Sequence, residues 1–298
     1  MTTTTQIPPT DAVDIRRKAQ LVIVSVSSWG GEKVDRGVSI ATCQNQQADR
    51  KSGRFVKKLV PPEALKARGK AVTALRETVE RLSLPFDRGR RLLPNASYIK
   101  NLKQIKDSIK AVEDATEDFL YQFPSWQQAG QAQLGKMYDP ADYPSISQLR
   151  TKFDVALDFE PIPRKEHFLL DMNQGIVDEI AAKAEAKVES RLQEAQQSAW
   201  TNVLEVTSHF AEVMSDPSKR FKRSTFDKLL DTLEVTPALN LQDDPMLDAV
   251  VEDIRDTLSG IDVDMLRNNP KVRATVAKAT SDHSEEISKL CDFADAIS

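Results

Sequence analysis

The chain has 298 residues, 40% of them hydrophobic and 29% charged, a composition ordinary for a soluble globular protein of one or two domains. Its ten glycines argue against a glycine-rich phosphate-binding loop and against a long flexible linker. The net charge of −4 hides an asymmetry: residues 1–110 hold 22 Lys+Arg and 10 Asp+Glu, whereas residues 111–298 hold 19 and 35. This asymmetry suggests a polyanionic partner for the basic part. The alternative is that two oppositely charged subdomains attract each other.

Export and membrane insertion are not expected. Cys43 and Cys291 lie far apart without the spacing of a metal site, so we expect no disulfide framework and a reducing, cytoplasmic environment. The basic run 16–18 precedes an apolar stretch at 21–26, but that stretch is too short for a secretory signal and no small-residue cleavage site follows it. No apolar run approaches the roughly 18 residues that cross a membrane.

The N-terminal half is expected to be a basic α+β region at 19–163, preceded by a flexible arm at 1–18 that is rich in Thr and Pro. A β-branched run at 21–29, ended by two glycines, predicts a strand. We expect residues 54–60 to form a second strand that pairs with the first, after a polar loop at 44–53.

The remainder of this region alternates helices with proline-rich breaks. Apolar residues at helical spacing predict a helix from Pro62 to Pro85, and a turn is expected at 87–91. A second helix should start at Asn95 and end at Pro124, because proline disrupts a helix interior. Further along the chain the sequence predicts a short helix at 125–136 and an extended stretch at 153–162.

Residues 164–298 are expected to form an acidic helical region. Val177, Val188, Ala199 and Phe210 recur every eleven residues, which predicts one long helix over 173–214. Such a helix needs a partner along its length, either later helices of the same chain or a second subunit. The candidate packing helices are 225–233, 245–258, 265–278 and 284–297. The predicted fold class is therefore α+β and mostly α-helical, with a small N-terminal β element and a C-terminal bundle around a long helix.

Residues for catalysis are not apparent. The three histidines are isolated, and there is no phosphate-binding glycine loop, dinucleotide fingerprint or nucleophile elbow. The acidic pairs 243–244 and 262/264 lie near helix starts, where aspartate caps free N–H groups, and this explains them better than a metal does. We therefore predict no catalytic residue, no metal, no cofactor and no enzymatic activity.

The basic residues of the first third form three groups: a lysine ridge on the helix after Asn95, an arginine turn before it, and a cluster around the second strand. Lysines at helical spacing can follow a phosphate backbone and release its counterions, although a solvated helix face is the simpler explanation for the ridge alone. Exposed rings among basic residues bind single strands by stacking, and Trp29 at a strand end is the best candidate. The predicted nucleic-acid-binding residues are Trp29, Lys33, Arg36, Arg50, Lys51, Arg54, Lys57, Lys58, Arg88, Arg90, Arg91, Lys100, Lys103, Lys106 and Lys110.

Residues 21–163 resemble a phage and bacterial family known only as a domain of unknown function. The matching features are Trp29-Gly30-Gly31, the Leu59-Val60-Pro61-Pro62 entry to a helix, Leu84-Pro85-Phe86-Asp87-Arg88-Gly89 followed by Leu92-Leu93-Pro94, and the segment from Phe119 to Trp126. The family includes the single-stranded-DNA-binding transcription cofactor of lytic phages that package a virion RNA polymerase. The resemblance implies a homo-oligomer, a dimer or tetramer, that binds single strands without sequence specificity, supports a phage RNA polymerase and acts in the host cytoplasm.

The sequence thus predicts a single-stranded-DNA-binding protein that regulates phage transcription, with a further role in replication kept open. The sequence contains no recognisable recognition helix, zinc finger or basic leucine zipper, which favours single strands over duplex DNA. The alternative is a structural adaptor for an ATPase or polymerase, without nucleic-acid affinity of its own, whose basic face docks on an acidic protein.

Overall fold

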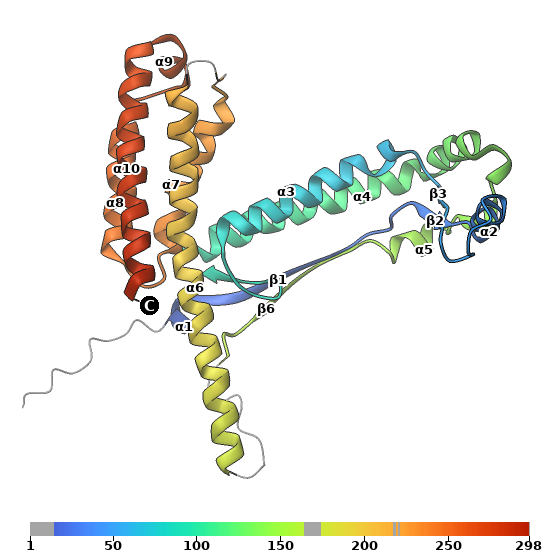
Figure 1. The fold of residues 1–298 in the computed structure, drawn as a ribbon, viewed down its shortest axis with the longest axis horizontal. Helices are drawn as coiled ribbons and strands as arrows, with labels where there is room; N and C mark the ends of the chain where they lie inside the picture. Colours follow the sequence, from blue (N-terminus) through green and yellow to red (C-terminus); the bar gives the residue numbers. More distant parts are fainter. Residues whose placement is uncertain (1–14, 164–173, 217–218, 220, 298) are drawn as a thin grey trace, which may run out of the picture. The chain divides into compact units, whose positions relative to one another are not determined.

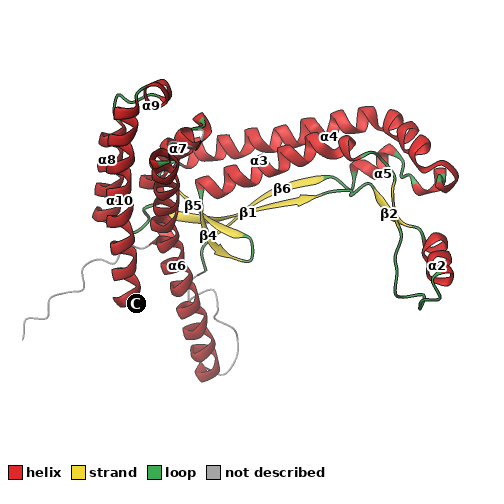
Figure 2. Cartoon of the chain, turned by 45° about the horizontal axis from the view of Figure 1, so that its top comes forward, coloured by secondary structure: helices red, strands yellow, loops and turns green. Residues whose placement is uncertain are grey.

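The computed structural model describes residues 15–163, 174–216, 219 and 221–297. The fold is α+β and 69% helical, with small antiparallel sheets, which confirms the predicted fold class. The elements, shown in Figures 1 and 2, are α1 (Ile15–Lys18), β1 (Ala19–Ser27), β2 (Glu32–Val34), α2 (Arg36–Asn45), β3 (Val56–Lys58), α3 (Lys66–Leu82), β4 (Leu84–Asp87), β5 (Arg90–Pro94), α4 (Tyr98–Leu134), α5 (Ile146–Arg150), β6 (Asp154–Glu160), α6 (Gln174–Ser215), α7 (Arg223–Leu239), α8 (Pro245–Leu258), α9 (Val263–Asn268) and α10 (Pro270–Ile297). Short 3-10 turns lie at Pro62–Leu65, Gly135–Met137 and Pro140–Asp142.

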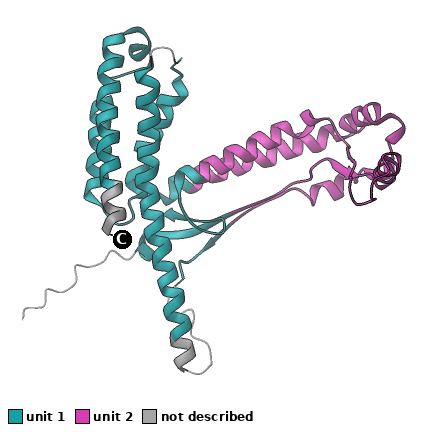
Figure 3. Cartoon of the chain, viewed as in Figure 1, with its two compact units in different colours: residues 1–23, 80–101, 158–298 teal, residues 24–79, 102–157 magenta. Residues whose placement is uncertain are grey.

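The chain divides into two compact units (Figure 3). Unit 1 comprises residues 1–23, 80–101 and 158–298, and unit 2 comprises residues 24–79 and 102–157. The units therefore cut the chain differently from the predicted domains 19–163 and 164–298. They also carry opposite net charges: unit 2 holds 17 Lys+Arg and 13 Asp+Glu, and unit 1 holds 24 and 32.

Unit 1 is built around α6, against which α7 and α10 pack, and α8 packs on α7 and α10 to complete a helical bundle (Figure 1). Val188, Ala199 and Phe210, spaced by eleven residues, are all buried, so the predicted stripe is the core-facing side of this helix. Strand β4 packs on the same helix. Later helices and a hairpin of the same chain thus cover the described part of the stripe, which supplies the partner that the long helix requires.

In unit 2, helices α3 and α4 lie side by side as an antiparallel pair (Figure 2). Hydrogen bonds tie Arg68 to Thr116 and Ser108 to Thr78. Arg68 is 4% exposed and also donates to Ser28 Oγ and to the Ser27 carbonyl, so its guanidinium joins the end of β1 to both helices. A second core gathers Phe119, Phe123 and their neighbours near the end of this pair.

Strand pairing differs from the sequence prediction. The larger sheet has the order β4-β5-β1-β6, and β1 pairs antiparallel with β5 rather than with residues 54–60. The predicted turn at 87–91 is a hairpin, in which Arg88 and Gly89 adopt left-handed backbone angles (φ 45° and 83°) that suit a two-residue connection. Pro85 is tolerated because β4 is an edge strand. Strand β3 pairs with β2 instead.

Two helices were predicted to end too early, one at Pro124 and the other at Leu233, and both run on through a proline. Helix α4 continues through Pro124 to Leu134, and α7 continues through Pro237 to Leu239. The apolar face of α4 stays buried on both sides of the proline, at Phe119, Phe123 and Leu134, so packing outweighs the lost hydrogen bond. The two helices predicted at 265–278 and 284–297 are also divided differently in the structure. The break between helices falls at Asn269, and α10 is continuous from Pro270 to Ile297.

Other local predictions are confirmed or corrected at single residues. Asp244 and Asp262 cap the first N–H groups of α8 and α9, as their position near helix starts predicts. Within the predicted arm, residues 15–18 form α1 and Ile15 is buried, whereas residues 1–14 lie outside the described part of the chain. Helix α2 was not predicted. Asp35 caps it by accepting a hydrogen bond from the Val38 N–H (3.0 Å).

Candidate nucleic-acid interface

Residues 32–58, here called the basic lobe, contain β2, α2, a loop and β3 within unit 2. The two strands pair from Glu32–Lys58 to Val34–Val56. Backbone hydrogen bonds close the lobe, from the Asp35 N–H to the Phe55 carbonyl (3.0 Å) and from the Leu59 N–H to the Gly31 carbonyl (2.8 Å). The lobe carries seven Lys+Arg and three Asp+Glu, a net charge of +4.

The basic lobe has almost no apolar core. Its buried side chains are Ser39, Cys43 and Lys57. Lys57 Nζ contacts Asp35 Oδ2 (3.3 Å), the Met137 carbonyl oxygen (3.2 Å) and the Asp142 carboxylate, so all three ammonium N–H groups have acceptors. Asp142 also accepts from Lys33. We call Lys33, Asp35, Lys57 and Asp142 the anchor cluster, because it joins the lobe to the turn after α4.

The anchor cluster shifts the pKa of each of its buried members toward the charged form. The hydrogen bond to Asp142 raises the pKa of Lys57, against the effect of burial. Burial by itself would raise the pKa of Asp142, but the hydrogen bonds from Lys33 and Lys57 outweigh it and the pKa lies below its ordinary value. The pKa of Asp35 is lowered chiefly by the Val38 N–H and then by Lys57. Lys57, Asp142 and Asp35 are therefore ionised at neutral pH.

The remaining cations of the basic lobe are exposed and unengaged. Five side chains make no hydrogen bond or ion pair with a described residue: Arg36, Arg50, Lys51, Arg54 and Lys58. The one nearby loop acid, Asp49, uses its side chain to accept from the Lys51 backbone N–H (2.7 Å). These five side chains are what the lobe offers to a polyanion.

Trp29 does not present its ring for stacking. It lies 6.1 Å from Phe119 and 5.9 Å from Phe123 between ring centroids, half-buried against the core of unit 2. The glycines after it let the chain turn, and Gly31 (φ 68°) lies so close to Val60 that a Cβ would sit 2.9 Å from it. Trp29 thus packs, half-buried, against the edge of this core, whereas Phe86 is 7% exposed and belongs to the core of unit 1. Lys57 likewise belongs to the anchor cluster and is not available to phosphate.

The predicted lysine ridge on α4 is largely paired. Lys103 contacts Asp107 (2.6 Å) and Lys110 contacts Asp114 (2.7 Å), each one helical turn away. Lys100, which belongs to unit 1, contacts Glu234 (2.6 Å). Only Lys106 of this ridge makes no ion pair within the described structure. The ridge therefore carries a weaker positive field than its lysine spacing suggests.

The arginine turn is the tip of the β4–β5 hairpin in unit 1, where its three arginines have different environments. Arg91 is mostly buried and donates to the Ser83 hydroxyl (2.8 Å) and carbonyl (2.7 Å). Desolvation lowers its pKa. Arg90 lies near Asp87 and Glu160 and over the Phe86 ring. Arg88 is exposed and makes no ion pair with a described residue. Only Arg88 is thus free to bind an anion.

Sequence reasoning missed three kinds of residue. Lys66, Lys70 and Arg76 are exposed on α3 without ion pairs in the described structure, and their helical spacing was a visible signal. Tyr121, on α4, is 88% exposed and is a better stacking ring than Trp29. Asp142 of the anchor cluster had no sequence signal, because it lies 85 residues from Lys57.

The described structure contains no group of three or more His, Cys, Asp or Glu residues placed to hold a metal ion. His209 and His283 are the histidines within the described chain, and His283 contacts the Thr257 hydroxyl (3.1 Å). None of the described helices is both long enough and apolar enough to span a membrane. Cys43 is a free thiol in the lobe.

Comparison of this chain with protein-family models, with curated proteins and with solved structures found no match. The resemblance of residues 21–163 to a phage and bacterial family therefore stays a prediction.

Proposed function

We propose that this protein binds single-stranded nucleic acid without sequence specificity, through phosphate contacts made by the basic lobe. The observation that carries the proposal is the set of five exposed cations, Arg36, Arg50, Lys51, Arg54 and Lys58, that no described carboxylate neutralises. Cations without internal partners gain most by replacing the counterions of a phosphate backbone.

The anchor cluster supports this role. Because the lobe has almost no apolar core, something other than apolar packing must hold its surface in one arrangement. The buried ion pair of Lys57 with Asp142 does this. Asp35 and Asp142 pair with the buried Lys57, and the arginines stay exposed on the outside of the lobe. A binding function, rather than catalysis, suits this division.

The strand preference and the biological setting rest on the sequence. The absence of a groove-reading motif and the family resemblance favour single strands over duplex DNA. From the same resemblance we infer a homo-oligomer in the host cytoplasm that supports a phage RNA polymerase during transcription.

A titration by fluorescence anisotropy, with single-stranded and duplex oligonucleotides at several salt concentrations, tests the proposal. We expect the triple variant Arg50→Gln, Lys51→Gln, Arg54→Gln to reduce the slope of log affinity against log salt by about 2 for single strands, which weakens binding about 100-fold at about 0.1 M salt. The matched control is Lys222→Gln, Lys228→Gln, Lys289→Gln, which removes the same charge from exposed positions of unit 1.

Three results would contradict the proposal or a part of it. Equal weakening by both triple variants would mean that overall charge, not the lobe, governs binding. No binding by the unmodified protein at low salt would leave the adaptor hypothesis, and stronger binding to duplex would remove the single-strand preference.

A further inference from the structure

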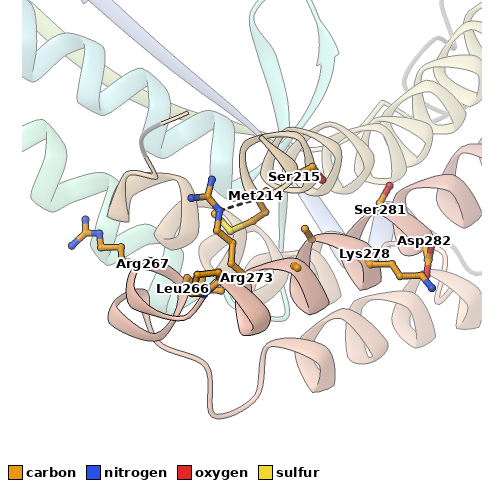
Figure 4. A pocket seen from close by; sticks show the side chains of 11 residues that line it. Met214, Ser215, Leu266, Arg267, Arg273, Lys278, Ser281 and Asp282 are labelled. Atoms are coloured by element: carbon orange, nitrogen blue, oxygen red, sulfur yellow. Dashed lines mark hydrogen bonds between the residues drawn. The ribbon is translucent and has the colours of Figure 1, made fainter. Parts of the chain in front are cut away.

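A pocket of about 520 Å³ lies where the end of α6 meets α9 and the first half of α10, all within unit 1 (Figure 4). Its apolar lining includes Met214 from α6, Leu266 from α9 and Ala277 from α10. The volume lies in the range of small-molecule sites. The proposed nucleic-acid contacts belong to the other unit and make no use of this pocket.

Three cations line the same pocket: Arg267, Arg273 and Lys278. They stand out because residues 158–298 hold only 16 Lys+Arg against 28 Asp+Glu. Arg267 is 46% exposed and lies 3.8 Å from Asp264, a long and weak ion pair. Lys278 is exposed and makes no ion pair with a described residue. One acid, Asp282, also lines the pocket.

Arg273 is held in place by the end of α6. Its Nε donates to the Met214 carbonyl (3.0 Å), and its Nη2 donates to the carbonyls of Val213 (2.8 Å) and Asp216 (2.9 Å). These bonds satisfy carbonyls that a helix end leaves without partners. Within the described structure Nη1 has no acceptor. The guanidinium is thus a fixed cation with one amino group still able to donate.

We propose that this pocket binds a small amphipathic anion, a molecule with one acidic group joined to an apolar body of aromatic or aliphatic carbon. The apolar lining takes the body, because burying it removes hydrocarbon from water. Arg273 takes the acidic group, since charge-assisted hydrogen bonds to an anion are stronger than neutral ones. Arg267 and Lys278, whose side chains point to opposite sides of the pocket (Figure 4), add to the positive field around it. Neither a purely apolar ligand nor an inorganic anion satisfies both halves of the site.

The test compares two fluorescent probes of nearly the same shape, 8-anilinonaphthalene-1-sulfonate, which is an anion, and N-phenyl-1-naphthylamine, which lacks the sulfonate. The full-length protein should bind the sulfonate saturably at one site and the neutral probe at least about tenfold more weakly, a difference equal to about 1.4 kcal/mol. Raising the salt concentration should weaken only the binding of the sulfonate.

Variants then locate the site. The double variant Arg267→Gln, Lys278→Gln should weaken sulfonate binding about tenfold, by the same 1.4 kcal/mol, and leave the neutral probe unchanged. Ala274→Trp, at an exposed position that lines the pocket, should block both probes by filling the space. Lys271→Gln is the matched control, because Lys271 is exposed on the same helix and does not line the pocket.

Circular dichroism of each variant verifies that the bundle is folded. The proposal fails if the two probes bind equally, if the double variant behaves like Lys271→Gln, or if Ala274→Trp leaves sulfonate binding unchanged.

Discussion

The basic lobe and the α4 lysine ridge are both rich in cations, but they place their carboxylates differently. In the lobe, Asp35 and Asp142 contact the buried Lys57, and the outer arginines make no ion pair with a described carboxylate. On α4, Asp107 and Asp114 lie on the same exposed face as Lys103 and Lys110 and pair with them. Net charge per segment therefore says little about a binding surface. What matters is whether the carboxylates pair with a buried lysine or with the exposed cations themselves.

The largest effect that separates the two regions should come from Lys57. Lys57→Met preserves its length but leaves Asp142 with one fewer partner, and we expect the free energy of unfolding of unit 2 to fall by about 3 kcal/mol. Trypsin should then cut faster at Arg50 and Lys51, and nucleic-acid binding should weaken. Urea denaturation followed by fluorescence measures the first effect, and limited proteolysis the second.

The neighbouring Lys58 provides the control, because it is exposed and makes no ion pair with a described residue. Lys58→Met should change the free energy of unfolding by no more than about 0.5 kcal/mol. If both methionine variants lower the free energy of unfolding equally, the anchor cluster does not hold the lobe.

The next effect concerns the close packing of the chain after β3 against α4. A Cβ at Gly130 would lie 2.1 Å from the Leu59 carbonyl oxygen, so Gly130→Ala must push the chain after β3 away from the helix, at a cost of about 2 kcal/mol. Gly69 in α3 has no atom within 4 Å of the same position, so Gly69→Ala should stabilise the protein by about 0.5–1 kcal/mol. Thermal and urea denaturation of the pair measure the contrast. Equal effects would refute the close approach at Gly130.

The pH dependence should also distinguish the regions. The pKa values of Asp142 and Asp35 are lowered by folding, so their contribution is present above the ordinary value of 3.8 and is lost as the pH falls below it. The pKa of Lys57 is raised, so its contribution is present below 10.5 and is lost as the pH rises above its folded value. Hydrogen exchange of the lobe amides, in wild type and Lys57→Met, should show the loss at high pH only in wild type. At low pH the loss should be smaller in the variant but still present, because Asp142 keeps Lys33 and Asp35 keeps the Val38 N–H. Equal pH dependence in both would contradict this assignment.

The smallest effect should appear on α4. The double variant Asp107→Asn, Asp114→Asn releases Lys103 and Lys110 from their ion pairs, and exposed pairs of this kind are worth up to about 1 kcal/mol. Nucleic-acid affinity at low salt should rise about twofold to fivefold, as expected from that energy. Anisotropy titration measures it, with Asp231→Asn, Asp248→Asn as a charge-matched control in unit 1. If the gain in affinity exceeded the loss in affinity caused by the lobe triple variant, the α4 ridge and not the lobe would be the stronger binding surface.

Much of the helical structure was determined by the sequence alone. The eleven-residue stripe of α6, the extended stretch of β6 and the capping aspartates 244 and 262 were all predicted, because periodicity and capping are local properties of the chain. The ends of α4 and α7 were not, because each helix runs on through a proline, Pro124 or Pro237, where burial on both sides outweighs the local penalty.

The candidate site depends on contacts between distant parts of the chain. Only the tertiary structure decided these contacts. The choice of β5 as the partner of β1, the burial of Trp29 against α4, and the engagement of Lys57 by Asp142 involve residues far apart in sequence. Sequence patterns report which residues are cationic or apolar, because those properties belong to the side chain. Whether a cation is free to bind depends on what folds against it, and that is a property of the packed structure.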